Sequence, residues 1–318
     1  MVTVNELFSG IGAQVKALKR AGINYKVIGV SEIDDYAIAS YEAIHGKVKN
    51  YGDISKIPKL DYADLWTYSF PCQDISKAGR LAGISTNTRS GLLYEVQRLL
   101  DVSKEESELP KYLLLENVAM LVSKRFKKEF LEWLEYLDNL GYNTTYSLIN
   151  ASKYGVPQNR VRVFAVSVLK SEGKIFEFPP EVPLRLQLED IIEECVDDRY
   201  YINPDRYKNV LSFVGDKVRA KVNTKLGYSE MSLGGICKID YPNSYNKRGR
   251  IQGGGRLSPT LMTTDGGVVF VEKSGRVRRL TALEFWRFMG FDDEDYYRAA
   301  STGISETQLK KNRQETVL

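Results

Sequence analysis

The first 170 residues alternate between short apolar runs and amphipathic segments. Apolar residues follow one another in the runs of buried parallel strands, whereas between 125 and 141 they recur at helical spacing. The predicted strands are residues 2–8, 25–33, 64–70, 111–118 and 160–169. The predicted helices are residues 12–22, 35–46 and 125–141. This alternation predicts an α/β fold with a doubly wound, Rossmann-like sheet.

The pattern changes after FEFPPEVP. The following residues, to about 255, are polar and rich in tyrosine, lysine and glycine, with short strand-like pieces and no clear period. A helical pattern, TALEFWRFMGF, returns at Thr281. We therefore predict a large α/β domain over 1–178, a smaller, irregular, mostly-β domain inserted over 179–272, and a return to the large domain over 273–318.

Composition narrows the possible chemistry. The three cysteines are odd in number and far apart, which argues against a disulfide framework and against a metal-binding pair. A single histidine, His45 at a predicted helix end, argues against a Ser-His-Asp hydrolase, a Cys-His protease and a multi-histidine metal site. No metal is expected, and acid–base chemistry must use carboxylates, cysteine or arginine.

The remaining bulk properties indicate a globular protein of the cytoplasm. No run of about 18 apolar residues predicts a membrane helix, and the start, MVTVNELFSG, lacks the features of a signal peptide. The net charge of +4 permits a polyanionic partner without requiring one.

A glycine turn and two carboxylates point to a nucleoside-bearing cofactor. The turn FSGIG, with Phe8, Gly10 and Gly12, follows the first predicted strand and opens the first helix. Glu32 ends the second strand about 20 residues on, where an acidic group can accept hydrogen bonds from ribose, and Asp53 is placed at the end of a third strand. The glycine motif alone would equally fit a plain tight turn. A full GxGxxG is absent, which favours an adenosine with a small appendage over a dinucleotide.

The stretch SFPCQDIS places Cys72 between Pro71 and a glutamine, directly after an apolar strand. Taken singly, such a cysteine is usually inert, a glutamate after a strand is usually a solvated end, and paired arginines are usually a charged sheet edge. The order of the motifs along the chain decides between these interpretations.

That ordered set resembles the DNA (cytosine-5-)-methyltransferases of bacterial and phage type. The resemblance covers the chain except for residues 180–255 and the final ones. The motifs are ELFSGIG, SEID, GDI, FPCQ, LLLENV, YGVPQNRVRVF, RLSPTLMT and RRLTALEFWRFMGF. The resemblance implies S-adenosyl-L-methionine as cofactor, methylation of carbon 5 of a flipped cytosine in double-stranded DNA, and target recognition by residues 179–272.

The same resemblance assigns roles to individual residues. Cofactor binding falls to the residues Phe8, Gly10, Gly12, Glu32, Asp53 and Pro71. Catalysis falls to Cys72, Glu116, Arg160 and Arg162. A thiolate at Cys72 would add to carbon 6 of the base, and Glu116 would bind the ring nitrogen and the exocyclic amine. Arg160 and Arg162 lie on alternate residues of a predicted strand, so we expect them to point the same way and to supply positive charge near the thiolate.

Other functions stay open at this stage. A tRNA cytosine-5 methyltransferase has the same fold, although the substantial insert favours duplex DNA. A binding or regulatory protein without turnover is the second alternative, and a nicotinamide dehydrogenase is disfavoured by the incomplete glycine motif. We expect a monomer, and no target sequence can be derived from the insert.

The end of the chain departs from the family. After SETQLKK the family continues with Gln-Ala-Gly-Asn-Ser, whereas this chain reads NRQETVL. One reverse translation of residues 312–318, read in a shifted frame, gives Gln-Ala-Gly-Asn-Ser-Ile. We therefore expect a frameshift that truncates the chain before the last motif, with weakened cofactor binding. A divergent terminus or a partner chain that supplies the segment are the alternatives.

Overall fold

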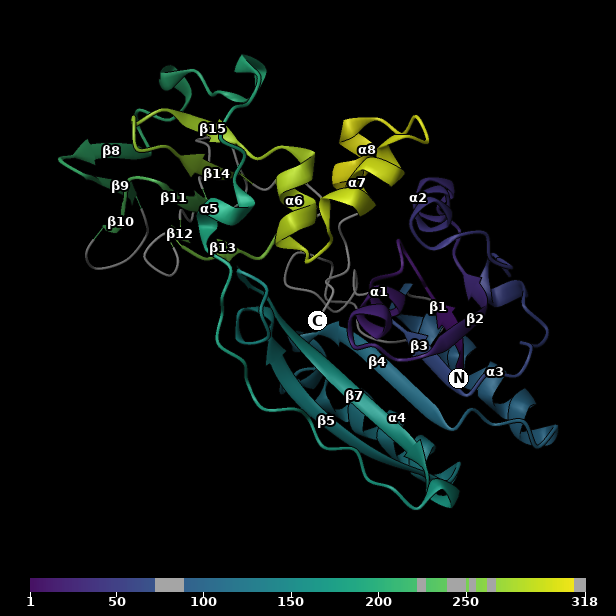
Figure 1. Ribbon diagram of the computed structural model, residues 1–318. Coiled ribbons are helices and arrows are strands. Elements are labelled where there is room, and N and C mark those ends of the chain that lie inside the picture. The colour runs from purple at the N-terminus through teal and green to yellow at the C-terminus, as the bar shows by residue number, and fades with distance from the viewer. Residues whose placement is uncertain (72–88, 222–226, 239–249, 252–255, 262–266, 312–318) are drawn as a thin grey trace. The chain divides into compact units, whose positions relative to one another are not determined.

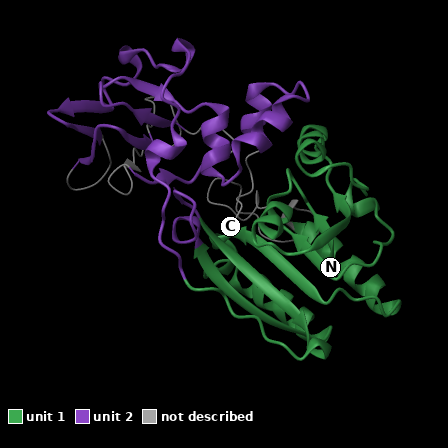
Figure 2. Cartoon of the chain, viewed as in Figure 1, with its two compact units in different colours: residues 1–149, 161–180, 317 green, residues 150–160, 181–316, 318 purple. Residues whose placement is uncertain are grey.

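A computed structural model describes the chain except for residues 72–88, 222–226, 239–249, 252–255, 262–266 and 312–318. The nucleophile candidate Cys72 and the divergent end at 312–318 both lie outside the described residues. Figure 2 shows the two compact units into which the chain divides. Unit 1 comprises Met1–Ile149 and Val161–Pro180, and unit 2 comprises Asn150–Arg160 and Glu181–Thr316.

Unit 1 is built on a six-stranded sheet with the strand order β2-β1-β3-β4-β7-β5 (Figure 1). The first four strands of this order run parallel to one another, and β7 runs antiparallel to β4. The strands are β1 (Val2–Leu7), β2 (Tyr25–Ser31), β3 (Leu65–Tyr68), β4 (Tyr112–Val118), β5 (Tyr142–Asn150) and β7 (Val161–Leu169). The predicted α/β fold with a Rossmann-like sheet is confirmed.

Helices connect these strands and bury apolar faces on the sheet. In α4, for example, Phe130, Trp133 and Leu137 are buried, and Trp133 Nε1 donates a hydrogen bond to the hydroxyl of Tyr68 in β3 at 3.1 Å. The longer helices are α1 (Ala13–Arg20), α2 (Asp35–His45), α3 (Leu93–Glu105) and α4 (Lys127–Asn139). The short 3-10 turns are η1 (Ile54–Lys56), η2 (Arg89–Leu92), η3 (Ala119–Val122) and η5 (Lys170–Glu172).

Unit 2 contains small sheets and short helices. Three strands form the sheet β10-β9-β8, four form the sheet β12-β11-β14-β15, and β13 pairs with β6. The strands are β6 (Gln158–Asn159), β8 (Leu211–Val214), β9 (Lys217–Lys221), β10 (Tyr228–Ser232), β11 (Gly235–Lys238), β12 (Arg250–Ile251), β13 (Ser258–Pro259), β14 (Val268–Val271) and β15 (Val277–Arg279). The helical segments are η4 (Ala151–Lys153), α5 (Leu188–Ile191), η6 (Asp198–Tyr200), η7 (Pro204–Arg206), α6 (Ala282–Phe288), α7 (Asp293–Ala300) and α8 (Glu306–Lys311).

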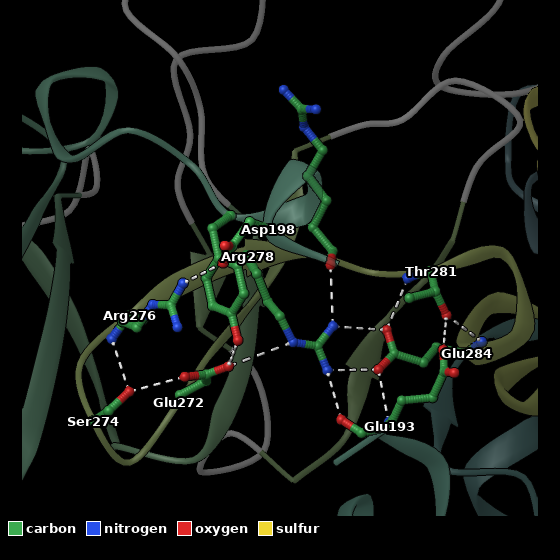
Figure 3. Close-up of polar contacts among 10 residues, drawn as sticks. Glu193, Asp198, Glu272, Ser274, Arg276, Arg278, Thr281 and Glu284 are labelled. Atoms are coloured by element: carbon green, nitrogen blue, oxygen red, sulfur yellow. Dashed lines mark hydrogen bonds and ion pairs between the residues drawn. The ribbon is translucent and has the colours of Figure 1, made fainter. Parts of the chain in front are cut away.

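A buried ion pair joins α6 to the four-stranded sheet of unit 2 (Figure 3). Arg278 in β15 donates from Nη2 and Nη1 to the two carboxylate oxygens of Glu284, at 2.6 and 3.0 Å, and both side chains are at most 1% exposed. Glu284 also accepts a hydrogen bond from Thr281 N at 2.8 Å, and the Thr281 hydroxyl donates to Glu193. Both charged groups are therefore hydrogen-bonded, the condition under which buried charges are tolerated.

The compact units differ from the expected domain boundaries. The sequence predicts that residues 273–318 return to the large domain, whereas β15 and helices α6 to α8 belong to unit 2. The reason is local. β15 completes the sheet through antiparallel pairing with β14, and Arg278 in that strand carries the contact to α6.

Candidate active site

The predicted cofactor turn follows β1 and has a constrained backbone. Phe8 has a φ of 61°, in the left-handed region that non-glycine residues rarely adopt, and Gly10 and Gly12 follow with φ of 54° and 82°. Such backbone conformations cost energy and persist where the surrounding structure holds them in place. The chain thereby turns sharply from β1 into α1.

Glu32 holds this turn from the end of β2. Its Oε2 accepts a hydrogen bond from Gly10 N at 2.9 Å, and its Oε1 accepts from Ile33 N and Asp34 N, each at 2.8 Å. Gly10 and Glu32, two of the residues that the sequence assigns to cofactor binding, are 22 positions apart and are thus brought into direct contact. A ribose hydroxyl placed here would meet a carboxylate whose orientation is already fixed.

A buried carboxyl group lies behind the turn, and sequence reasoning missed it. Glu6 in β1 is fully buried, accepts a hydrogen bond from the Tyr41 hydroxyl at 2.6 Å and a second from Val15 N in α1 at 3.2 Å. Burial raises the pKa of Glu6 to about 7, although both hydrogen bonds act to lower it. Glu6 therefore ties β1 to α1 and α2 around the turn.

The only histidine packs against the same turn. His45 ends α2, as predicted, and its Nε2 lies 3.1 Å from the carbonyl oxygen of Ile11. A Cβ atom placed on Gly12 would lie 2.6 Å from His45 Nε2 and 2.7 Å from the Tyr41 ring, so only glycine fits there. The role of His45 is to pack against the backbone of the cofactor turn.

The expectation of a third strand before Asp53 is wrong. The segment makes only an isolated bridge between Asn50 and Val30, because Gly52, with a φ of 74°, turns the chain away before a ladder can form. Asp53 instead caps η1, accepting from Ser55 Oγ at 2.8 Å and Ser55 N at 3.0 Å. These hydrogen bonds lower the pKa of Asp53. Its carboxylate is thus already engaged in a helix cap.

The chain reaches the nucleophile segment from the end of β3. Tyr68 is the last residue of the strand, Ser69 and the buried Phe70 follow, and Pro71 is the last described residue before Cys72. The predicted cofactor contact Pro71 therefore follows β3 and directly precedes the predicted nucleophile, Cys72, in the sequence.

Glu116 and Arg162 form an ion pair within unit 1. Arg162 Nε lies 3.1 Å from Glu116 Oε1, and their side chains are 15% and 17% exposed. The two residues come from neighbouring antiparallel strands, Glu116 near the end of β4 and Arg162 near the start of β7. An oriented carboxylate beside a guanidinium is suited to binding a polar base edge that carries both donors and acceptors.

Arg160 occupies a different environment and is not part of β7, so the expectation that both arginines lie on one strand is wrong. β7 begins at Val161, whereas Arg160 belongs to unit 2, is 5% exposed and donates from Nη1 to the carbonyl of Leu261 at 3.4 Å. The preceding residues, Gln158 and Asn159, pair with Ser258 and Pro259 in a separate small sheet. Arg160 therefore lies between this small sheet and the first residue of β7.

Comparison with known proteins identifies the family. The model of the C-5 cytosine-specific DNA methylase family matches residues 2–311. The chain belongs to this family. The resemblance noted in the sequence, the fold class and the enzyme class are thereby confirmed, and the family relationship implies methylation of cytosine with S-adenosylmethionine.

Bacterial and phage enzymes are among the relatives of this methyltransferase. The type II methyltransferase M2.ScrFI of Lactococcus lactis subsp. cremoris is 31% identical, over 100% of this chain and 96% of its own length. The orphan methyltransferase M.SPBetaI of Bacillus phage SPbeta is 28% identical, over 97% of this chain and 93% of its own.

Solved structures agree in fold. The S. pombe Dnmt2 methyltransferase superposes with a TM-score of 0.69 at 19% identity, covering 99% of this chain and 94% of the other. A putative DNA modification methyltransferase encoded within an E. coli prophage gives 0.62 at 18% identity, covering 98% and 97%.

Among the described residues, no group of histidine, cysteine, aspartate and glutamate side chains could hold a metal ion. Over the same part of the chain, no helix is long and apolar enough to cross a membrane.

Proposed function

We propose that this methyltransferase transfers a methyl group to carbon 5 of a flipped cytosine in a specific double-stranded DNA sequence, through a covalent adduct with Cys72. The observation that carries the proposal is the Glu116–Arg162 pair, which lies in the same unit as the cofactor turn and the strand leading to Cys72. The ordered motifs and the family support the same reaction.

The cofactor site fits an adenosine-bearing molecule. Phe8, Gly10 and Gly12 form the turn against which the cofactor would lie, Glu32 offers an oriented carboxylate for ribose, and Asp53 and Pro71 are the further proposed contacts. When bound, S-adenosylmethionine supplies an electrophilic methyl group on a sulfonium.

The protein's own residues make the base reactive. The Cys72 thiolate adds to carbon 6 of cytosine, which turns carbon 5 into the nucleophilic end of an enamine. Negative charge develops on the ring as the thiolate adds, so Glu116 gives a proton to the ring nitrogen and accepts a hydrogen bond from the exocyclic amine, while Arg162 keeps the carboxyl group oriented. After methyl transfer, the carbon 5 proton leaves to a base and the thiolate is expelled, which restores the ring. Arg160 is retained as a further positive charge for this site on the strength of its motif.

We further propose that the enzyme acts as a monomer on DNA in the cytoplasm of a bacterium or a phage-infected cell. The bacterial and phage origin of its relatives supports this setting. Unit 2 would then recognise the target sequence through base edges and phosphates.

Methyl transfer to plasmid DNA tests the reaction, with tRNA as the competing substrate. Cys72→Ser should retain less than about one per cent of the activity, because a hydroxyl is far less acidic than a thiol. Cys195→Ser, at the exposed cysteine of unit 2, is the matched control and should stay active. DNA carrying 5-fluorocytosine should trap the unmodified protein covalently, because no proton is left at carbon 5 to be lost. Activity retained by Cys72→Ser, or transfer to tRNA alone, would refute the proposal.

A further inference from the structure

Two side chains hold the residues that lead into the nucleophile segment. The carbonyl of Phe70 accepts a hydrogen bond from Asn117 Nδ2 at 3.0 Å, and the hydroxyl of Ser69 accepts one from Gln14 Nε2 at 3.3 Å. Asn117 belongs to β4 and directly follows Glu116, whereas Gln14 is the second residue of α1, two positions after Gly12 of the cofactor turn. Both contacts lie within unit 1.

The register of the sheet explains why Asn117 reaches Phe70. β3 and β4 are parallel, with Tyr68 opposite Leu115, so two residues further on Phe70 lies alongside Asn117. The ladder has ended at Tyr68, and Pro71 has no backbone N–H with which to continue it. The side-chain amide of Asn117 thus provides the donor that a further ladder hydrogen bond would have provided.

Asn117 is held in a single orientation. It is 3% exposed, and while its Nδ2 donates to Phe70, its Oδ1 accepts from Val118 N at 2.8 Å. Rotating the amide by half a turn would place Asn117 Oδ1 against the Phe70 carbonyl oxygen and Asn117 Nδ2 against the backbone N–H of Val118. Because Phe70 is also buried, at 2% exposure, loss of this contact could not readily be made good by water.

We propose that Asn117 is a positioning residue for the nucleophile: through the Phe70 carbonyl it fixes the start of the segment that carries Cys72, with Gln14 as a second anchor from the cofactor helix. This inference rests on the proposed function of Cys72. Neighbouring residues of a strand point to opposite sides, so Glu116 and Asn117 divide two tasks between them. Glu116 receives the base, and Asn117 places the group that attacks it.

The test compares Asn117→Asp with Asn5→Asp. Asn5 is an equally buried asparagine of unit 1 whose Nδ2 donates to a remote carbonyl, that of Asp61, at 2.8 Å. Both variants lose a donor and should lose similar stability. Only Asn117→Asp should lose kcat, by about 10- to 100-fold, because small displacements of a reacting group are costly. The affinities for S-adenosylmethionine and DNA should change less than about threefold, since neither the turn nor unit 2 is altered.

The rate of covalent trapping on 5-fluorocytosine DNA isolates the attack by the thiolate. It should fall in parallel with kcat for Asn117→Asp and stay near the unmodified rate for Asn5→Asp. Equal trapping rates for the two variants would overturn the inference.

If circular dichroism shows that Asn117→Asp is unfolded, the trapping rate of the Gln14→Leu variant tests the inference instead. This half-buried position should tolerate the change while trapping slows by about two- to fivefold, and an unchanged rate would overturn the inference. An unmodified protein that neither traps nor methylates would instead refute the proposed function itself.

Discussion

Replacing the buried Glu6 by glutamine should remove a pH dependence from the stability of the methyltransferase. The pKa of this carboxyl group is raised from 4.5 to about 7 by its burial. Below pH 4.5 the group is protonated in both the folded and the unfolded chain, so it makes no difference there. Between these two values the unfolded chain releases its proton while the folded chain retains it. The free energy of unfolding must therefore fall as the pH rises through this window.

The size of the effect follows from the two pKa values. Each pKa difference of one corresponds to about 1.4 kcal/mol, so a rise from 4.5 to about 7 corresponds to about 3 kcal/mol of lost stability above neutral pH. Glutamine has no proton to lose and can still accept from Val15 N, although its contact with the Tyr41 hydroxyl must be rearranged at a cost of about 1 kcal/mol. Near pH 5 the variant should be slightly less stable than the unmodified protein, and near pH 8 it should be more stable by about 2 kcal/mol.

Urea unfolding followed by tryptophan fluorescence measures this directly, because Trp66 and Trp133 are buried in the same core as β1. Asp64→Asn is the control of opposite sign. Partial burial raises the pKa of Asp64, but hydrogen bonds from Thr3 and Lys111 outweigh it and hold the pKa well below its usual range. Its contribution is therefore present at neutral pH and lost only in acid. An unmodified protein and a Glu6→Gln variant with the same pH slope between about 5 and 8 would refute the reasoning.

Two further predictions concern the cofactor turn and the core of unit 2. Gly12→Ala should weaken S-adenosylmethionine binding by at least about tenfold, since its Cβ would collide with His45 and Tyr41, as calorimetry with the cofactor can show. Gly22→Ala, at a similar positive φ but with nothing within 4 Å, should lose only stability, and equal cofactor affinity in both variants would contradict the steric explanation. Arg278→Met should lower the free energy of unfolding by about 3–5 kcal/mol because it leaves the buried Glu284 unpaired. Adding Glu284→Leu should restore much of that loss in the same denaturation experiment, whereas an additive loss would show that the charge itself was not the cause.

The sequence could predict those parts of the site that depend on local signals. The turn at Phe8–Gly12, the carboxylate at Glu32 and the glutamate at the end of β4 all follow from a strand-like run and the residues directly after it. The helix α3 could also have been found, because Leu93, Val96, Leu99 and Leu100 are spaced as on one buried helical face.

What could not be predicted depends on contacts between residues far apart in sequence. The hydrogen bond from Tyr41 to Glu6 spans 35 positions, and the one from Asn117 to Phe70 spans 47. Arg160 shows the same limit, because its place in unit 2 depends on the pairing of β6 with β13, about 100 residues later. Alternation along a strand predicts side-chain direction only within the strand, and β7 begins at Val161, one residue after Arg160.

The reversed strand β7 explains why the glutamate and the arginine stand where they do in the sequence. Parallel strands deliver their carboxyl ends to one edge of the sheet, and β1, β2, β3 and β4 bring the FSGIG turn, Glu32, Ser69 to Pro71, and Glu116 to that edge. A fifth parallel strand would offer only its last residues there. Because β7 runs antiparallel to β4, with Arg162 opposite Val118, it offers its first residues instead. An arginine at the start of a strand can therefore meet a glutamate at the end of its neighbour, and Arg162, the last arginine of the Gln-x-Arg-x-Arg element, does so as the second residue of β7.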